Sequence, residues 1–456
     1  MDGMQEWPVE VIRRIRKLEG KIKNLEKENK EFRKENQELK EKINKLEKRL
    51  RIYENPHTPS SQRRFKGGSR GNNPCGKRGA PEGHKGATRK VPEPDEVISV
   101  TADECPFCGC NPGESKKVET AIIEELPPPR KIKVTQYEFH MYECQNCGLW
   151  FTTEHEDYPK EGVFGVNLIT YITMLKFHLR GVIRRIQDFL RHLCGFDISV
   201  KGIHDVLLRV GNACRGEYHR LLQRVRAARW RYTDETGMRV NGNNWWLWNF
   251  RTDTDESLAV IRESRGRDVL EEILGEDYNG ADITDGWKVY KNLKVVQRCW
   301  AHLLREVDSN KNISKEGESL SKEIHKRYRL LKEFLGKDPP MRERKRQKRI
   351  WEKELAEIVE KYDSALHTRP LVTYLKNGLG CWYTCLLYPG MEPTNNLGEQ
   401  AIREHVIMRK IIGTFRSIEG SENYQYIASM FATWRLQGKN IFEELEKLLR
   451  KELCLS

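Results

Sequence analysis

Three carboxylates in the second half of the chain are placed to suit phosphate chemistry. Asp234 lies in the middle of a strand-like segment, and Glu399 lies in PTNNLGEQAIREH. Asp285 ends another strand-like segment and is followed by Gly286, whose backbone freedom suits a sharp turn. Two magnesium or manganese ions ~3.5 to 4 Å apart can stabilise the attacking and leaving oxygens of an in-line displacement at phosphorus. Because magnesium prefers hard oxygen ligands, acids must hold it. Brought together, the three acids are a candidate two-metal site.

The segments around these acids predict how they are positioned. RWRYTDETGMRV, NWWLWNF and SLAVIRES are three strand candidates, followed by a helical GRDVLEEILG and the further strand candidates GADITDGW and KVVQRCW. Three antiparallel strands, then helix, strand, helix and strand, is the order of the ribonuclease-H-like fold. There the first strand carries an acid at its middle, the fourth ends in another, and a third comes from a later helix. Thr394 or Asn395 could cap that helix and place Glu399 in its first turn.

Each acid has an alternative. Glu235 would replace the first acid if the strand register slipped by one, because neighbours on a strand face opposite sides. Asp282 competes with the second acid, although it lies inside its strand. Glu399 could instead form a surface ion pair with Arg403 at i+4.

We assign the catalytic core to residues 229–307 and 369–420. Cys299, Trp300 and His302 lie close behind its fifth strand. They could contact metal or DNA, but a packed strand end with a satisfied histidine is the simpler interpretation.

Two cysteine pairs in residues 96–155 have the spacing of zinc ligands. The pairs are Cys105 with Cys108 and Cys144 with Cys147. Four thiolates complete a tetrahedral, structural zinc site, and the alternating KVTQYEFHMYE between the pairs would join them as a small ribbon. Cys110 and His140 are spare ligand candidates, and unligated buried thiols are the alternative.

Residues 8–54 predict a coiled coil, because apolar residues recur every 3.5 positions between charged flanks. Asn29 and Asn36 share one seam with isoleucines. A buried asparagine is satisfied best by its twin in a parallel dimer, so we predict a homodimer. A single solvated helix is the alternative.

Residues 55–95 are rich in proline, glycine and cations, so they cannot bury enough apolar surface to fold alone. Their charge suits phosphate contact, although a solvated linker is equally compatible. A leucine-zipper transcription factor would carry its basic helix before the zipper, which argues against that class. The DNA-binding candidates, including three from the helix of the third acid, are Arg63, Arg64, Lys77, Arg78, Lys85, Arg403, Arg409 and Lys410.

Three further segments are predicted to be helical. Residues 160–228 have the outline of a helix-turn-helix, with a break at Gly195 and a possible cap at Ser199. Residues 308–368 form a charged insertion whose apolar spacing predicts a docked hairpin; its basic face could grip DNA or be solvated. Residues 421–456 would be closing helices.

Composition supports a nucleic-acid partner. The formal net charge is +14, with 38% hydrophobic and 32% charged residues, and a long polyanion is the expected partner of such an excess. No segment approaches the ~18 to 20 apolar residues of a membrane span. The start of the chain lacks a secretory signal, so we expect a cytoplasmic protein. Among its twelve cysteines, the closely paired ones are then better interpreted as metal ligands than as disulfides.

The sequence resembles the insertion-sequence-66 family of transposases over nearly its whole length. The motifs that carry the resemblance are the zipper, PEGHKGATR, the cysteine pairs, TDETGMRV, DGWKVY, QRCWAHLLRE, TNNLGEQAIR, RKIIGTFRSIEG and TWRLQGKN. The resemblance implies a DDE triad at Asp234, Asp285 and Glu399 on a ribonuclease-H-like core, and makes accessory transposition proteins plausible. Gly398 and Gln400 stand where family members often have Ala and Arg.

We therefore expect a multidomain α+β transposase: coiled coil, zinc ribbon, helix-turn-helix-like segment and α/β core with a helical insertion. It would bind the terminal inverted repeats of its element and target DNA, release a 3′ hydroxyl with metal-activated water, and join that hydroxyl to target DNA. The alternatives are a catalytically inactive zinc-containing DNA-binding protein derived from a transposase, and a ribonuclease-H-like nuclease or resolvase that cuts without joining.

Overall fold

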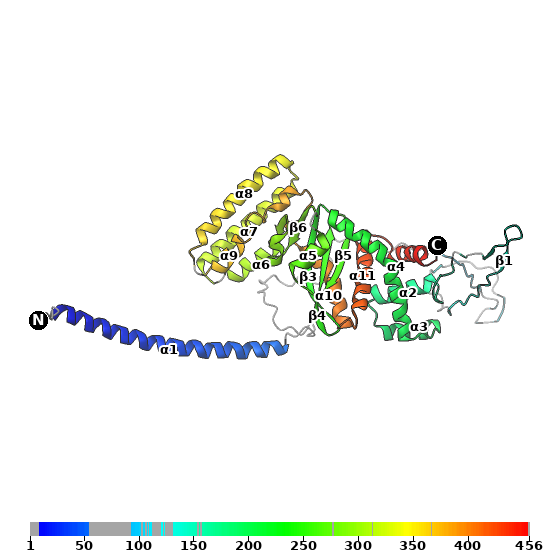
Figure 1. The fold of residues 1–456 in the computed structure, drawn as a ribbon, viewed down its shortest axis with the longest axis horizontal. Coiled ribbons are helices and arrows are strands. Elements are labelled where there is room, and N and C mark those ends of the chain that lie inside the picture. Colours follow the sequence, from blue (N-terminus) through cyan, green and yellow to red (C-terminus); the bar gives the residue numbers. More distant parts are fainter. Residues whose placement is uncertain are drawn as a thin grey trace. The chain divides into compact units, whose positions relative to one another are not determined.

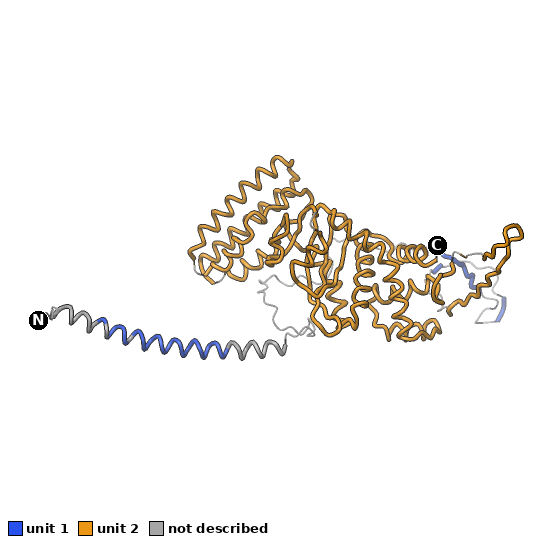
Figure 2. Tube along the Cα trace, viewed as in Figure 1, with its two compact units in different colours: residues 1–125 blue, residues 126–456 orange. Residues whose placement is uncertain are grey.

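A computed structural model describes most of the chain. The described residues are 9–53, 93–101, 104, 107, 109–111, 120, 121, 123, 131–152, 155, 157–275, 278–311, 313–365 and 367–454. The chain divides into two units, residues 1–125 and 126–456 (Figure 2). No helix of the described part is long and apolar enough to cross a membrane.

The first unit contains one long helix, α1 (Val9–Tyr53). Its 45 residues correspond to about 68 Å of helix. Apolar side chains of the predicted seams at Leu18, Ile22, Leu25 and Phe32 are 54–62% exposed. These four side chains are therefore uncovered, and the coiled coil that would cover them stays a prediction.

Several predicted positions of this unit lie outside the described residues. They are Arg63, Arg64, Lys77, Arg78, Lys85, Cys105 and Cys108.

The second unit begins with a small antiparallel ribbon. Strand β1 (Met141–Glu143) pairs with β2 (Trp150–Thr152). In the turn between them the Gly148 N–H donates to the Cys144 carbonyl over 2.8 Å. Gly148 has a φ of 69°, which favours glycine. The second cysteine pair thus lies in a tight turn.

Three helices follow: α2 (Val166–Phe177), α3 (Ile183–Cys194) and α4 (Val200–Ala227). The predicted break and cap are both confirmed. Gly195 ends α3 with a φ of 60°, and the Ser199 side chain accepts a hydrogen bond from the Gly202 N–H over 2.9 Å at the start of α4. Isoleucine and leucine side chains are buried where these helices pack against one another.

A five-stranded mixed sheet forms the centre of this unit (Figure 1), in the order β5-β4-β3-β6-β7. Its strands are β3 (Trp230–Val240), β4 (Asn243–Thr252), β5 (Ser257–Arg262), β6 (Ala281–Thr284) and β7 (Val296–Arg298). The first three are antiparallel, whereas β6 and β7 run parallel to β3. Helix α5 (Arg267–Leu274) precedes β6, and a 3-10 turn, η1 (Lys288–Asn292), follows it. This is the predicted succession of elements.

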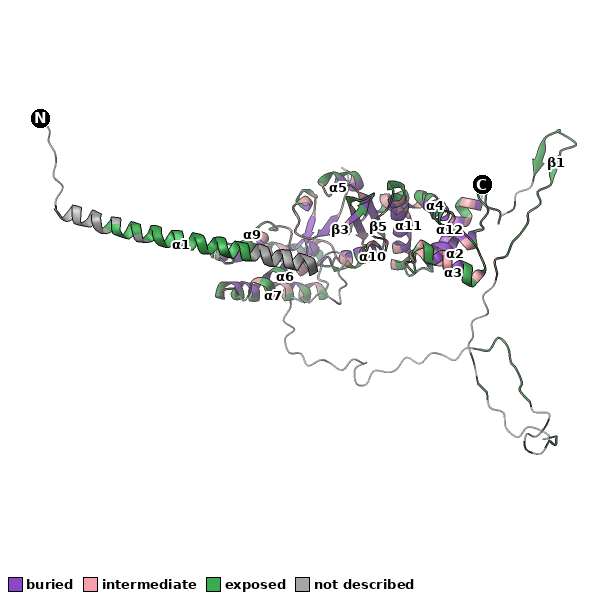
Figure 3. Cartoon of the chain, turned by 90° about the horizontal axis from the view of Figure 1, so that it is seen from below, coloured by how far each residue is buried: buried purple, intermediate pink, exposed green. Residues whose placement is uncertain are grey.

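Helices cover both faces of the sheet, so that its strands are largely buried (Figure 3). Apolar residues of β4 and β5 pack with α4 and α5 on one face. On the other face β3 contributes Met238 and Val240, which pack with Ile402 and Met408 of α10 (Asn396–Ile412).

The edge strand β5 is covered by α11 (Ile418–Leu436). Side-chain oxygens of Gln425, Ser429 and Thr433 accept hydrogen bonds from the backbone N–H groups of β5 over 2.9–3.1 Å. These three residues are four apart and therefore lie on one helix face. The sequence analysis did not foresee this contact.

Along the chain, a helical insertion lies between β7 and α10, and it is longer than the predicted residues 308–368 because α6 and α9 pack in the same hydrophobic cluster as α7 and α8. It contains α6 (Trp300–Asn310), α7 (Lys315–Gly336), α8 (Met341–Tyr362), α9 (Arg369–Lys376) and the 3-10 turn η2 (Thr384–Leu387). In α8, Leu355, Ile358 and Val359 are buried as the apolar spacing predicts, but Ile350 is 39% exposed and Trp351 takes the inward position instead. The chain closes with α12 (Ile441–Leu449) and a π turn, η3 (Arg450–Cys454).

Candidate active site

The three candidate acids come from neighbouring elements. Asp234 lies in the middle of β3, and Asp285 directly follows β6, the parallel neighbour of β3. Glu399 lies in the first turn of α10, where its N–H donates to the Asn395 carbonyl over 2.9 Å. The negative charges of Asp285 and Glu399 both raise the pKa of Asp234. Residues 234, 285 and 399 are therefore brought together in space.

Asp234 is the acid with the most strongly perturbed ionisation. Burial raises its pKa from 3.8 to about 7, helped by the charges of Glu235, Asp285 and Glu399. Its carboxylate accepts a hydrogen bond from the Glu235 N–H over 3.0 Å, and within the described chain it has no cationic partner. A desolvated acid among other acids is stabilised in its charged form by a cation, so this donor set fits a divalent metal.

Glu399 is turned toward the side chains of α6. Its Oε1 lies 2.7 Å from Arg305 Nη2 and 3.9 Å from His302 Nε2. The ion pair that the described residues show for Glu399 is therefore with Arg305, and not with Arg403 as the alternative interpretation had it. No three His, Cys, Asp or Glu side chains of the described residues are arranged as a metal-binding group. The three acids lie near one another, but Glu399 would have to give up its ion pair with Arg305 before it could complete a metal site.

The two alternative acids have structural partners of their own. Glu235 faces the opposite side of β3, where its carboxylate accepts hydrogen bonds from Arg265, at 2.6 Å, and from the Tyr290 hydroxyl. Asp282 is fully buried and accepts two hydrogen bonds from Arg231, at 2.8 and 3.0 Å. Both acids are therefore committed to ion pairs that hold the sheet.

The turn that carries Asp285 is closely packed. The carboxylate accepts a hydrogen bond from the Trp287 N–H over 2.8 Å, which is an Asx-type turn. A Cβ at Gly286 would lie 2.3 Å from Arg298 Nη2 and 2.5 Å from Tyr374 Cε2. Glycine was predicted here for a sharp turn, and the reason is instead the lack of space for a side chain.

Arg298 is a residue that the sequence analysis missed. Only 5% of it is exposed, and its guanidinium lies 4.6 Å from the ring centre of Tyr374 and 5.2 Å from that of Trp382. Such stacking suits the flat, weakly hydrated guanidinium. The positive charge of Arg298 therefore lies next to the turn that carries Asp285.

The N-terminus of α10 is fastened to the sheet through Asn395. Its side-chain amide donates to the Thr233 carbonyl over 3.0 Å, and its backbone N–H donates to Cys299 Sγ over 3.1 Å. These bonds fix the start of α10, and hence Glu399, relative to β3. Cys299 therefore contacts the start of α10 at the packed end of β7.

His302 does not match the predicted satisfied histidine. Its Nδ1 is buried with no hydrogen-bond partner among the described residues. Burial and the charge of Arg305 lower the pKa of His302 from 6.5, so the ring is neutral at neutral pH. The sequence signal for this residue was only its position behind the fifth strand.

The DNA-binding candidates on α10 differ in exposure. Arg403 and Lys410 are exposed. Arg409 instead donates to Thr236 Oγ1 over 2.9 Å and to the Gly237 carbonyl, and burial lowers its pKa. Arg409 is thus engaged in holding α10 against β3.

In the ribbon, Cys144 and Cys147 lie within one turn, and backbone N–H groups of Cys147 and Asn146 lower the pKa of the Cys144 thiol. Two thiols at this spacing can supply half of a tetrahedral zinc site. Their predicted partners lie outside the described residues, so the four-cysteine site stays a prediction.

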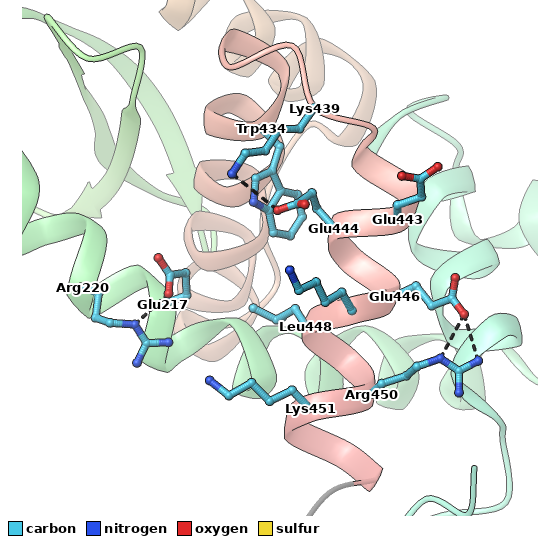
Figure 4. A pocket seen from close by; sticks show the side chains of 11 residues that line it. Glu217, Arg220, Trp434, Lys439, Glu443, Glu444, Glu446, Leu448, Arg450 and Lys451 are labelled. Atoms are coloured by element: carbon cyan, nitrogen blue, oxygen red, sulfur yellow. Dashed lines mark hydrogen bonds and ion pairs between the residues drawn. The ribbon is translucent and has the colours of Figure 1, made fainter. Parts of the chain in front are cut away.

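A groove of about 760 Å³ between α4 and α12 shares no residue with the acids (Figure 4). Its cations are matched by acids: Arg220 pairs with Glu217 at 2.7 Å and Arg450 with Glu446 at 2.9 Å. The lining carries five cations and four acids, so its charges nearly cancel and the groove has little excess that would attract a phosphate.

Comparison with known families assigns the central region. The family model described as "Transposase IS66 family" matches residues 161–423. This span includes the three helices before the sheet, all five strands and the three acids. The comparison with curated proteins gives no match.

Proposed function

Because the chain belongs to the IS66 family of transposases, we propose that it cuts DNA at the ends of a mobile element and joins the freed ends to target DNA. Asp234, Asp285 and Glu399 would hold two magnesium or manganese ions. The observation that carries the proposal is the half-buried carboxylate of Asp234, whose pKa of about 7 reflects partial burial and three neighbouring acids. Bound divalent ions would stabilise the attacking and leaving oxygens at phosphorus.

The side chains must change in two ways for this site to form. Asp234 must lose its proton, which its raised pKa of about 7 allows at neutral to slightly basic pH. Glu399 must leave Arg305, an ion pair whose side chains are 58% and 38% exposed. Exposed ion pairs contribute little free energy, so the exchange of Arg305 for a metal is feasible. Asn395 and Cys299 would keep α10 in place meanwhile.

We further propose DNA as substrate and a parallel homodimer through α1. The exposed seam residues of α1, such as Ile22 and Leu25, support an association that covers them, with Asn29 and Asn36 fixing the register. Two chains would bring two element ends together. A structural zinc on the four cysteines and accessory transposition proteins complete the proposal.

A second candidate function is a catalytically inactive DNA-binding protein derived from a transposase. The observation in its favour is the ion pair between Glu399 and Arg305, which occupies the third acid. The two candidates differ in one measurable property, which is metal-dependent cleavage.

The test is strand cleavage of DNA that carries the element's own ends, with magnesium, for the wild type, Asp234→Asn and Asp285→Asn. We expect metal-dependent nicking and strand transfer by the wild type, and loss of both in the two variants with DNA binding retained. Asp363→Asn is the matched control, because this exposed acid lies far from the sheet in the sequence and its ion pair among the described residues is with Lys376, at 3.7 Å. Wild-type rates in Asp234→Asn would refute the assignment of the site, and binding without cleavage in every protein would favour the inactive candidate.

A further inference from the structure

The first half of α8 carries an unusual excess of cations. Its residues 341–349, MRERKRQKR, contain six cations and one acid, whereas residues 350–362 contain two cations and four acids. In Figure 1 this helix runs along the outer edge of the insertion. The charge therefore changes sign along a single helix.

The packing of α8 determines which of these cations face outward. Arg344 is 2% exposed and donates from Nε to the Pro339 carbonyl over 2.8 Å. Trp351 and Leu355 are buried on the same side. The helical repeat of 3.6 residues places the opposite side at positions 342, 345, 346 and 349.

These outward positions form what we call the basic stripe: Arg342, Lys345, Arg346 and Arg349. All four are exposed. No ion pair of any of them occurs within the part of the chain that the structure describes. Other cations of the insertion are paired, for example Lys322 with Glu318 at 2.7 Å and Lys361 with Glu323 at 2.6 Å.

Helix stability does not explain the basic stripe. Cations near a helix N-terminus are opposed by the positive end of the helix dipole. Arg342 and Arg346, and likewise Lys345 and Arg349, are like charges four residues apart and repel each other. The stripe therefore weakens the isolated helix, and an anion bound along it would remove the repulsion.

We propose that the basic stripe docks on the phosphate backbone of duplex DNA. The inference rests on the proposed function and adds to it a DNA contact outside the acid cluster. Seven residues of helix span ~10 Å, the axial length of about three base-pair steps. Contacts of this kind position a protein on DNA without reading sequence.

The test is the salt dependence of binding of the full chain to a labelled DNA duplex of arbitrary sequence, for the wild type and R342Q/K345Q/R346Q/R349Q. Each lost phosphate contact lowers the slope of log K against log salt by about 0.9, so we expect a reduction of about 2 to 3.6. Glutamine is a good helix former, and without DNA the variant should melt at or above the wild-type temperature, because the repulsion is gone.

The matched control is K322Q/K353Q/K361Q/K376Q, which removes the same charge from paired lysines of the same insertion. Its slope should change by less than about 1, since these lysines already have anionic partners. Equal slopes in the two variants would overturn the basic stripe while leaving the transposase proposal intact. Failure of the wild type to bind any duplex would overturn both.

Discussion

The acids on the two faces of the central sheet differ in whether they have a cationic partner. On the face of α4 and α5, Asp282 is paired with Arg231 and Glu235 with Arg265. On the face of α10, Asp234 is half-buried without a cationic partner among the described residues, and its pKa is raised to about 7. A buried acid that has its counter-ion holds the fold, whereas a partly desolvated acid surrounded by acids is stabilised in its charged form by a cation. Adjacent strands thus carry the same side chain in two roles.

The largest expected effect comes from breaking the paired face. Asp282→Ala leaves the fully buried Arg231 without its counter-ion, which should lower the free energy of unfolding by about 3 to 5 kcal/mol. Denaturant unfolding measures this loss. Asp205→Ala, which removes an exposed partner of Lys201, should cost less than about 1 kcal/mol. Equal losses in the two variants would contradict the structural role of Asp282.

On the face of α10, replacing Asp234 should relieve an electrostatic cost as the pH rises, rather than create one. The folded state raises the pKa of Asp234 from 3.8 to about 7, so it retains a proton that the unfolded chain has lost between these pH values. The contribution of this carboxyl to stability is fully present below pH 3.8 and is lost as pH rises through about 7. Relative to Asp234→Asn, the wild type should lose on the order of 2 to 4 kcal/mol over this window.

The measurement is denaturant unfolding of both proteins at a series of pH values with a metal chelator present. Added magnesium should restore stability to the wild type at pH values above the pKa of Asp234, because a ligand that binds only the folded state stabilises it. Parallel pH profiles for the two proteins would show that folding does not raise the pKa of Asp234.

The smallest effect concerns Glu399, the candidate metal ligand on the face of α10 that pairs with a cation. Arg305→Gln removes the cation that lies 2.7 Å from Glu399, so a metal no longer has to displace it. Because an exposed pair contributes up to about 1 kcal/mol, metal affinity should rise about two- to fivefold. Calorimetric titration with manganese measures this rise, with Lys322→Gln as control. An unchanged or weaker affinity would mean that Arg305 does not compete with the metal.

Local patterns predicted the elements and their acids, because strand alternation and capping are properties of neighbouring residues. The succession of the strands along the chain, the break at Gly195 and the cap at Ser199 were all visible in this way. The counter-ions were not. Arg231 and Asp282 are 51 residues apart, and Arg305 and Glu399 are 94 apart, and no local pattern reports such pairs.

Close packing was equally hidden from the sequence. Gly286 was interpreted through its backbone freedom, although the space taken by Arg298 and Tyr374 is what excludes a side chain there. The apolar spacing of α8 likewise indicated Ile350 as a core residue, but the inward side of the helix is filled by Trp351. Both depend on which distant segments pack against a position.

The hydrogen bonds from β5 to α11 have a consequence for assembly. An edge strand with free N–H groups is a template for pairing with a second sheet, and the risk rises when two copies are held close together. Gln425, Ser429 and Thr433 occupy those groups on β5. The opposite edge strand, β7, has three residues, and its Arg298 N–H already donates to the Cys381 carbonyl over 2.9 Å. Both borders of the sheet are therefore protected against pairing with the sheet of another copy.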